Sequence, residues 1–217
     1  MGKIGFTPLQ NNIFSTFSRE KIASQFYFTG GTALSVFYLN HRESEDLDFF
    51  SEKDFDTDEI NRFIRSFTEK NMFRFRFTKR ANVRIYEILK GNQLILKVDF
   101  NYYPYKRIEK SKKRENNLDI DSLRDIAVNK LLTINQREDV KDFVDLYYLL
   151  ERYTIWDLIY GVEAKFGMEM DMFLIASDFL KIEEFDFLPK MLKPLKISDL
   201  VSFYKAKALE IGKKITK

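Results

Sequence analysis

The sequence predicts an α+β fold, in which a mixed β-sheet with helices is followed by an α-helical C-terminal part. Up to about residue 100, short runs rich in aromatic and β-branched residues alternate with helix-like segments. After a basic run at residues 106–114, strand signals disappear and apolar residues recur only at helical spacing. We therefore predict one domain at residues 1–116 and a helical domain at residues 117–217.

The first domain is predicted to begin with a helix, because Thr7 is a good N-cap and Pro8 suits the first helical turn. Phenylalanines at residues 73, 75 and 77 alternate with polar residues, which indicates a strand with one face in solvent. A Lys-Gly-Asn-Gln stretch suits the turn of a later hairpin. The predicted elements are helix 8–24, strand 26–29, helix 32–39, strand 46–50, helix 57–70, strand 73–78 and hairpin strands 83–89 and 94–100.

The second domain is predicted to contain helices alone. Its first helix begins at Ser122, which has Asp125 at the spacing of a capping partner. The predicted helices are 122–135, 140–152, 154–166, 170–180 and 198–211.

Composition excludes several kinds of site. There is no cysteine, so disulfides and zinc-thiolate sites are excluded, and a single histidine, His41, argues against a histidine-based metal site. We expect His41 to be a loop residue and not a catalytic base. The N-terminus lacks the apolar core of a signal peptide, and no window approaches the roughly 18 apolar residues of a membrane span. A soluble, cytoplasmic protein with no membrane partner is the expectation.

Two aspartates stand inside the strand predicted at residues 46–50. Asp46 and Asp48 point to one face of that strand, while Leu47 and Phe49 point to the other. Asp99 lies on the polar face of the strand at 94–100, so the three carboxylates converge if the two strands are neighbours. Convergent carboxylates suit magnesium, which takes oxygen ligands and is commonly shared with substrate phosphates. Solvated or arginine-paired aspartates are the alternative.

A glycine turn precedes the first of these aspartates. Gly30 and Gly31 follow a short strand and allow the backbone to approach a ligand closely. The helix beginning near Thr32 offers unpaired N–H groups and a positive dipole end to a phosphate. The alternative is an ordinary turn with an N-cap. A phosphate cradle beside a pair of metal-binding carboxylates favours a nucleotide site.

One lysine interrupts the apolar stripe of the helix at residues 122–135. Lys130 shares a face with Leu123 and is expected to have a carboxylate or phosphate partner, or to extend to solvent. Asp142 and Asp145 are neighbours on the next helix. An ion-pair network of these aspartates with Lys130 and Arg137 is the structural alternative to a nucleotide site.

Several blocks of the sequence resemble a known family. They are FTGGTAL at residues 28–34, R-x-S-x-D-L-D-F-F at 42–50, D-I-A-V-N-K-L-L at 125–132 and R-E-D-V-K-D-F-V-D-L-Y at 137–147. In this order they resemble the nucleotidyltransferase superfamily with the DNA-polymerase-beta-like minimal fold. Within it they are most similar to the AbiEii/AbiGii toxins of bacterial type IV toxin-antitoxin systems. The resemblance spans about residues 26–150.

The resemblance implies a nucleotidyltransferase-like domain and a helical domain that completes the active-site cleft. It implies an enzyme that transfers NMP from an NTP to an RNA acceptor, expected to be the tRNA 3′ end, with release of pyrophosphate. Two Mg²⁺ ions and an NTP would be required, and an antitoxin protein is the expected partner. Alternatives are a kinase-like phosphotransferase and a non-catalytic nucleotide-binding module.

The resemblance also assigns residue roles. Asp46 and Asp48 would hold the metal ions, with Asp99 as a third carboxylate that helps to activate the acceptor hydroxyl. The implied catalytic residues are Asp46, Asp48, Asp99, Lys130 and Asp142. The implied nucleotide-binding residues are Gly30, Gly31, Thr32, Lys130, Arg137, Lys141 and Asp145. The basic run at residues 106–114 is either a solvated loop or a track for the RNA backbone. The preceding Tyr102, Tyr103 and Tyr105 either stack on a base or finish the sheet.

Overall fold

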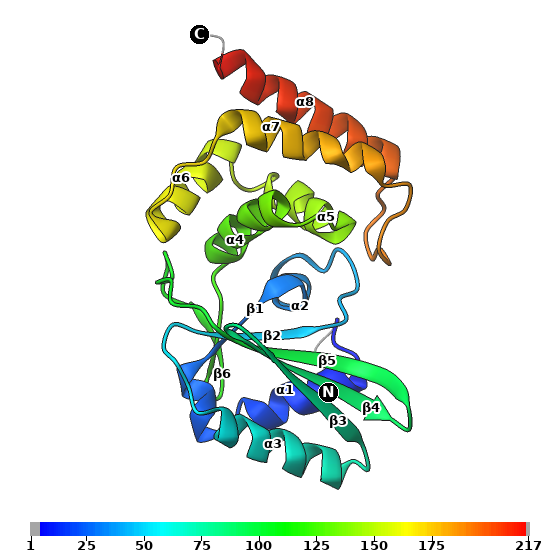
Figure 1. Ribbon diagram of the computed structural model, residues 1–217. Coiled ribbons are helices and arrows are strands. Elements are labelled where there is room, and N and C mark those ends of the chain that lie inside the picture. The colour runs from blue at the N-terminus through cyan, green and yellow to red at the C-terminus, as the bar shows by residue number, and fades with distance from the viewer. Residues whose placement is uncertain (1–4, 216–217) are drawn as a thin grey trace. The chain divides into compact units, whose positions relative to one another are not determined.

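A mixed β-sheet organises the first half of the chain (Figure 1). The computed structural model describes residues 5–215 and divides into two units. Of the described residues, unit 1 comprises 5–38, 44–106 and 110–122, and unit 2 comprises 39–43, 107–109 and 123–215. The chain therefore enters unit 2 briefly at two points before its helical half begins.

Within the described residues the sheet of unit 1 has seven strands in the order β3-β4-β5-β2-β1-β7-β6. Their bounds are β1 Tyr27–Thr29, β2 Leu47–Ser51, β3 Arg74–Arg80, β4 Val83–Lys90, β5 Gln93–Tyr102, β6 Lys113–Glu115 and β7 Leu118–Ile120. β2 runs antiparallel to β1 but parallel to β5. β2 and β5 are thus neighbours. This was the condition for Asp46, Asp48 and Asp99 to lie close together.

The expectation that strands end before the basic run is wrong. β6 and β7 form a small hairpin at residues 113–120, and β7 pairs in parallel with β1. Each of these strands has only three residues, so their alternation of buried and exposed side chains is too short to be recognised in the sequence. The partner that joins β7 to the sheet, β1, lies about ninety residues earlier in the chain.

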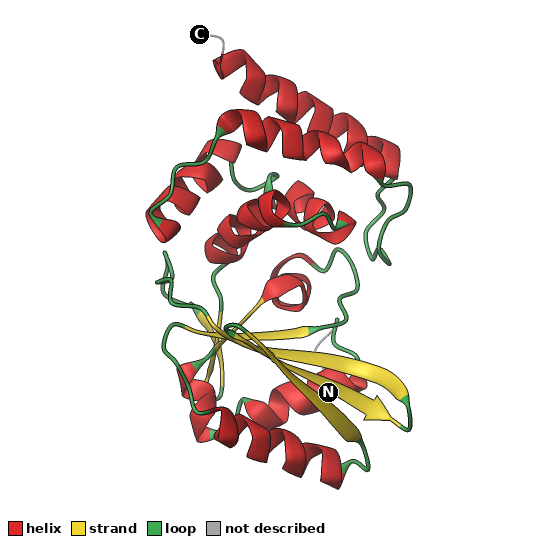
Figure 2. Ribbon diagram, in the orientation of Figure 1, coloured by secondary structure: helices red, strands yellow, loops and turns green. Residues whose placement is uncertain are grey.

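Two helices cover one face of the sheet in unit 1 (Figure 2). They are α1, Pro8–Phe17, and α3, Thr57–Lys70. Phe17 lies at the centre of this layer, with its ring 4.8 Å from that of Phe49, 5.1 Å from that of Phe63 and 5.1 Å from that of Phe100. Phe49 of β2 and Phe100 of β5 therefore face α1 and α3, which leaves Asp48 and Asp99 on the other face.

The helix expected at residues 8–24 is shorter in the structure. Thr7 caps α1 as predicted, and its side chain and that of Gln10 form a capping box. However, α1 ends at Phe17, and a separate 3-10 turn, Lys21–Gln25, buries Ile22 and Ala23. The helix after β1 begins two residues earlier than expected: α2 spans Gly30–Leu34 and continues as a π-helix over Ser35–Leu39.

Unit 2 is built from helices. They are α4 Leu123–Gln136, α5 Val140–Leu149, α6 Ile155–Phe166, α7 Met172–Leu180 and α8 Ile197–Ile215, with a 3-10 turn at Lys181–Glu184. Side chains of Asp139, Thr154 and Asp171 cap α5, α6 and α7 at their N-termini. A mixed sheet with helices followed by a helical C-terminal half confirms the predicted fold class. In the described part of the chain, no helix has the length and apolarity needed to cross a membrane.

Candidate functional site

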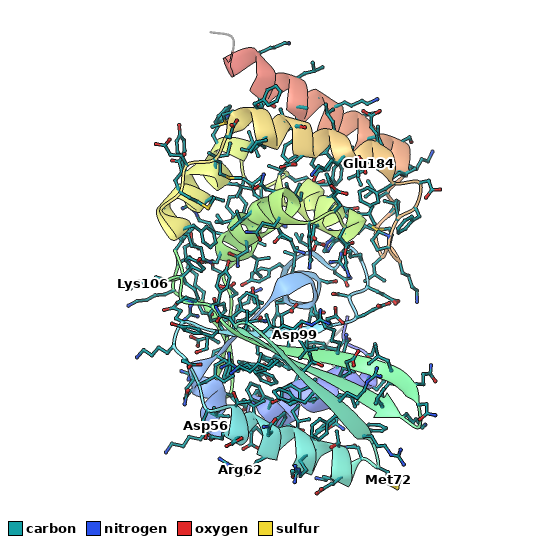
Figure 3. All side chains as sticks on the ribbon, viewed as in Figure 1. Asp56, Arg62, Met72, Asp99, Lys106 and Glu184 are labelled. Atoms are coloured by element: carbon teal, nitrogen blue, oxygen red, sulfur yellow. The ribbon has the colours of Figure 1, made fainter. Side chains whose placement is uncertain are left out.

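Two aspartates meet on the face of the sheet that α1 and α3 leave uncovered. Asp48 on β2 is directly opposite Asp99 on β5 in the parallel register. Leu47 and Phe49, on either side of Asp48, are fully buried, whereas Asp48 is only partly buried. The alternation predicted for this strand therefore places a pair of carboxylates on one surface. Figure 3 labels Asp99 on this face.

Gly30 brings the main chain against Asp48. Its φ is +76°, which L side chains rarely adopt, and a Cβ at this position would lie 2.1 Å from Oδ2 of Asp48. Only glycine fits such a contact. The start of α2 is thus in direct contact with the carboxylate of Asp48.

Thr32 connects the same helix to Asp46. Its buried hydroxyl donates a hydrogen bond of 2.5 Å to the main-chain oxygen of Asp46. Asp46 immediately precedes β2 and is partly buried. The observed role of the Thr32 side chain is therefore to position Asp46 relative to the glycine turn.

Asp99 is paired with a lysine that sequence reasoning did not single out. Nζ of Lys97 lies 2.6 Å from Oδ2 of Asp99, while Oδ1 of Asp99 is buried and has no hydrogen-bond partner within residues 5–215. Burial raises the pKa of Asp99, and the charge of Asp46 raises it further, against the opposing effect of Lys97. Burial lowers the pKa of Lys97, but its hydrogen bond to Asp99 and the charges of Asp99, Asp46 and Asp48 outweigh this, so the pKa is raised.

These residues have the chemistry of a divalent-cation site. The carboxylates of Asp46 and Asp48, together with the unsatisfied Oδ1 of Asp99, are the hard oxygen donors that magnesium prefers. Among the described residues, however, no three acidic or histidine side chains are already gathered around one point. The ammonium group of Lys97, and not a metal ion, neutralises one oxygen of Asp99. The donor set fits the metal: Asp46 and Asp48 would hold it, and water would supply further oxygen ligands.

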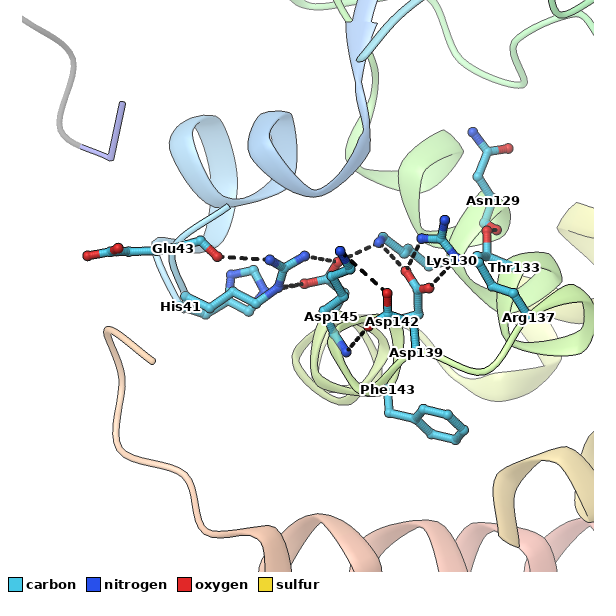
Figure 4. A network of polar contacts seen from close by, with 12 residues as sticks. His41, Glu43, Asn129, Lys130, Thr133, Arg137, Asp139, Asp142, Phe143 and Asp145 are labelled. Atoms are coloured by element: carbon cyan, nitrogen blue, oxygen red, sulfur yellow. Dashed lines mark hydrogen bonds and ion pairs between the residues drawn. The ribbon is translucent and has the colours of Figure 1, made fainter. Parts of the chain in front are cut away.

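A second polar cluster lies within unit 2, on α4 and α5 (Figure 4). Nζ of Lys130 is 2.6 Å from Oδ1 of Asp142 and 2.6 Å from Oδ2 of Asp145. Nε of Arg137 lies 2.8 Å from Oδ2 of Asp142. The ion-pair network that was the structural alternative to a nucleotide site is therefore present, and Lys130 is buried within it.

The opposing charges set the pKa values of this cluster. Burial raises the pKa of Asp145, but Lys130 and Arg42 outweigh it and hold the pKa well below its ordinary value. Burial acts in the same direction on Asp142, where Lys130 and Arg137 outweigh it and lower the pKa. For Lys130, burial lowers the pKa, but both aspartates outweigh this and raise it. The network is therefore ionised at neutral pH.

His41 and Arg42 complete the network from the segment at residues 39–43. Nε and Nη2 of Arg42 donate to the two oxygens of Asp145 at 2.6 and 2.8 Å, and Nε2 of His41 lies 2.7 Å from Oδ1. Burial, the largest influence, lowers the pKa of His41. His41 is in a loop, as expected, but it is fully buried. One feature of the sequence could have pointed to this pair: the sole histidine and the adjacent arginine lie a few residues before Asp46.

The remaining predicted residues are peripheral to these clusters. Lys141 is partly exposed, and its Nζ lies 3.4 Å from the carboxylate of Asp139 at the start of α5. Within the basic run, Nζ of Lys113 bonds to the main-chain oxygen of Phe37 and lies over the ring of Tyr38. Part of that run is therefore held by protein contacts. The ring of Tyr103 lies 4.8 Å from that of Phe50 and 5.0 Å from that of Tyr105.

The predicted site residues thus form two groups, one in each unit. Gly30, Gly31, Thr32, Asp46, Asp48 and Asp99 belong to unit 1, and Lys130, Arg137, Lys141, Asp142 and Asp145 belong to unit 2. The residues missed are Lys97 in unit 1 and His41 and Arg42 in unit 2. Each of these three contacts a predicted aspartate directly.

Comparisons with known proteins agree with the resemblance. The family model described as "Nucleotidyl transferase AbiEii toxin, Type IV TA system" matches residues 12–193. An uncharacterised protein of Aquifex aeolicus (strain VF5), aq_aa25, is 36% identical over 140 residues. That match covers 63% of this chain and 63% of the relative, so it spans less than two thirds of the relative's length.

Two solved structures share the fold. One is a proposed nucleotidyltransferase from Helicobacter pylori, with a TM-score of 0.59 at 19% identity, covering 97% of this chain and 98% of that chain. The other is MenT4, the nucleotidyltransferase toxin Rv2826c of Mycobacterium tuberculosis H37Rv, with a TM-score of 0.57 at 15% identity. It covers 94% of this chain and 82% of that chain. These likenesses concern the fold, while the family match confirms the predicted class, a nucleotidyltransferase toxin family.

Proposed function

Because the chain belongs to the nucleotidyl transferase AbiEii toxin family of type IV toxin-antitoxin systems, we propose that it transfers a nucleoside monophosphate from an NTP to an RNA acceptor. The acceptor we propose is the 3′ end of tRNA. One observation carries the proposal: Asp48 and Asp99 are paired on one face of the sheet, and Gly30 lies against Asp48. A carboxylate pair next to a glycine turn supports a site that joins metal ions to phosphates.

In this proposal the glycine turn holds the triphosphate. The main-chain N–H groups at the start of α2 would bind phosphate oxygens, because these groups have no partner within the helix. Gly30 and Gly31 present no side chain to obstruct this approach. Thr32 keeps Asp46 at a constant position relative to the turn through its hydrogen bond. The reacting phosphate and the carboxylates would thereby be brought together.

Asp46 and Asp48 are the proposed ligands of Mg²⁺, with two ions in the active state. When bound, the ions would neutralise charge on the attacking and leaving oxygens of an in-line displacement. Asp99, whose pKa burial raises, is suited to accept a hydrogen bond from the acceptor hydroxyl. Lys97 would stay beside Asp99 and limit the accumulation of negative charge on this face.

The cluster of unit 2 is proposed to supply cations to the nucleotide. Lys130 is bound by Asp142 and Asp145, so its assigned role is to keep these carboxylates and Arg137 in place. The side chain of Arg137 is 57% exposed, and Lys141 is also accessible, which makes them the members of the cluster best suited to meet phosphates. We further propose an antitoxin partner and action in the cytoplasm, where NTPs and RNA occur together.

A labelling experiment tests the reaction type. The protein would be incubated with Mg²⁺, total RNA and each NTP in turn, labelled on either the α or the γ phosphate. We expect α label to appear in RNA of tRNA size and γ label to appear in pyrophosphate. Transfer of the γ label to RNA or protein would identify a phosphotransferase and contradict the proposal. Binding of NTP with no transfer of either label would also contradict it.

A further inference from the structure

The face that carries Asp48 and Asp99 extends across two more strands of the sheet. β4 pairs with β5 so that Ile85 lies opposite Asp99, and β3 pairs with β4 so that Thr78 lies opposite Ile85. Directly paired residues point to the same side of a sheet. Thr78 on the edge strand therefore shares the face of the two aspartates.

Three arginines occupy this face of β3. Arg76 and Arg80 flank Thr78 at a spacing of two residues, and Arg74 precedes Arg76 by two, so all three point to the same side. We call Arg74, Arg76 and Arg80 the arginine row. All three side chains are exposed. The other face of β3 carries Phe75 and Phe77.

The arginine row has more positive charge than its neighbours neutralise. Nε of Arg76 is paired with Glu87 on β4 at 3.0 Å. No carboxylate lies within ion-pair distance of Arg74 or Arg80 in the described portion of the chain. Glu87 is the one acidic residue of β4, and the residues opposite it are Arg76 on β3 and Lys97 on β5. An exposed row with surplus cationic charge favours an anionic ligand.

We propose that the arginine row binds the sugar-phosphate backbone of the RNA acceptor, just upstream of the 3′ end that reaches Asp99. The proposal rests on the proposed function, since it takes RNA as the acceptor. Guanidinium groups suit phosphates because their planar fork donates two parallel hydrogen bonds. Contacts of this kind position a strand without reading its sequence.

The spacing of the sheet suits this path. Neighbouring strands lie about 4.8 Å apart, so β3 is roughly 10 Å from β5. At the axial rise of about 3.4 Å per nucleotide of a stacked, helical strand, this distance corresponds to about three nucleotides. Along β3, Arg74 and Arg76 are about 6.8 Å apart, and Arg76 and Arg80 about twice that distance, at about 3.4 Å per residue of an antiparallel strand. The row would therefore hold the phosphates that precede, on the 5′ side, the terminal nucleotides of the acceptor strand.

A pair of double variants tests the arginine row. Arg74→Gln with Arg80→Gln removes two charges that have no ion-pair partner. The matched control, Arg65→Gln with Lys79→Gln, removes two exposed charges from α3 and from the opposite face of β3. We expect the first variant to raise KM for RNA by about 10-fold, with kcat and KM for the NTP unchanged. The control should resemble the unaltered protein.

Direct binding separates this proposal from the proposed reaction. Affinity for a short, 5′-labelled single-stranded RNA would be measured by fluorescence anisotropy at several salt concentrations. The slope of log affinity against log salt should fall by about 1.4 in the row variant, because each lost phosphate contact removes about 0.7. An unchanged slope and affinity in that variant, or an equal loss in the control, would overturn the arginine row whether or not transfer occurs. If no NMP is transferred but the row variant, and not the control, binds RNA more weakly, the proposed reaction is wrong and RNA binding by the arginine row is supported.

Discussion

The carboxylates of the sheet and those of helix α5 are neutralised to very different extents. Asp145 is contacted by Lys130, Arg42 and His41, and its pKa is held well below the ordinary value. Asp99 contacts one lysine, retains a buried oxygen without a partner in the described part of the chain, and has a raised pKa. Both residues are largely buried. Burial alone therefore does not distinguish a structural carboxylate from a candidate site carboxylate.

The difference lies in what each carboxylate still lacks. Two full positive charges surround Asp145, so its removal leaves buried cations without compensation, which is costly. On the face that carries Asp46, Asp48 and Asp99, Lys97 forms an ion pair with Asp99, and three carboxylates close together repel one another. A divalent cation would complete that face, whereas it would find no opening in the α5 network. The comparison thus assigns metal binding to the carboxylates of the sheet and stability to the carboxylates of α5.

The largest effect on folding is expected from Asp145→Asn. This change leaves Lys130 and Arg42 buried without their shared carboxylate, and we expect the free energy of unfolding to fall by about 3–5 kcal/mol. Asp99→Asn is the matched change on the sheet, and its cost should be smaller, because it leaves one partly exposed cation, Lys97, without its carboxylate and burial already disfavours the charged form of Asp99. Urea unfolding monitored by circular dichroism measures both. Equal losses in the two variants would remove the distinction between the carboxylates.

Gly30→Ala should have the next largest effect. The added Cβ would meet Oδ2 of Asp48 at 2.1 Å and would also be strained by a φ of +76°. We expect a loss of about 1–3 kcal/mol of stability and a large drop in transfer, since Asp48 must move. Gly91→Ala is the control, because Gly91 has a φ of +61° with no atom within 4 Å of the added Cβ. If both variants transfer NMP at the same rate, the contact between Gly30 and Asp48 has no functional role.

A smaller effect is expected from pH. The pKa values of Asp142 and Asp145 are lowered in the folded state, so their contribution to stability is complete above the unfolded value of about 3.9. It is lost as the pH falls through the folded pKa values. Asp99 acts in the opposite direction, because its raised pKa makes protonation favour the folded state. The free energy of unfolding, measured at several values between pH 7 and pH 3, should therefore fall less steeply with falling pH for Asp145→Asn than for the unaltered chain. Parallel curves would contradict this assignment.

Local signals in the sequence predicted most elements but not their ends. The helix expected at residues 57–70 is α3 with the same bounds, because its apolar residues repeat strictly and Asp56 caps its N-terminus. The helix expected at residues 8–24 stops at Phe17, because Ile22 and Ala23 are buried by a separate turn. β6 and β7 were missed because short strands depend on a distant partner and not on their own pattern.

The candidate site divides in the same way. Asp46, Asp48 and the glycines were recognisable because they are close in the sequence and follow strand and turn patterns. Asp99 followed from its position on the polar face of a strand. His41 and Arg42 were not recognised, because their contacts are with Asp145, more than 100 residues later. Such contacts arise from tertiary packing, and the periodic pattern of residues along the chain does not reveal them.

Transfer of an α-labelled NMP to RNA by Asp48→Asn tests the central claim most directly, with Asp46→Asn beside it. Both variants should keep the unfolding free energy of the unaltered chain within about 1 kcal/mol, because surface-accessible carboxylates contribute little to folding. Transfer should fall by at least about 100-fold, equivalent to about 2.7 kcal/mol of lost transition-state stabilisation. Asp186→Asn, on an exposed residue, should transfer at the normal rate. Undiminished transfer by both Asp46→Asn and Asp48→Asn would contradict the assignment of the site to this face of the sheet.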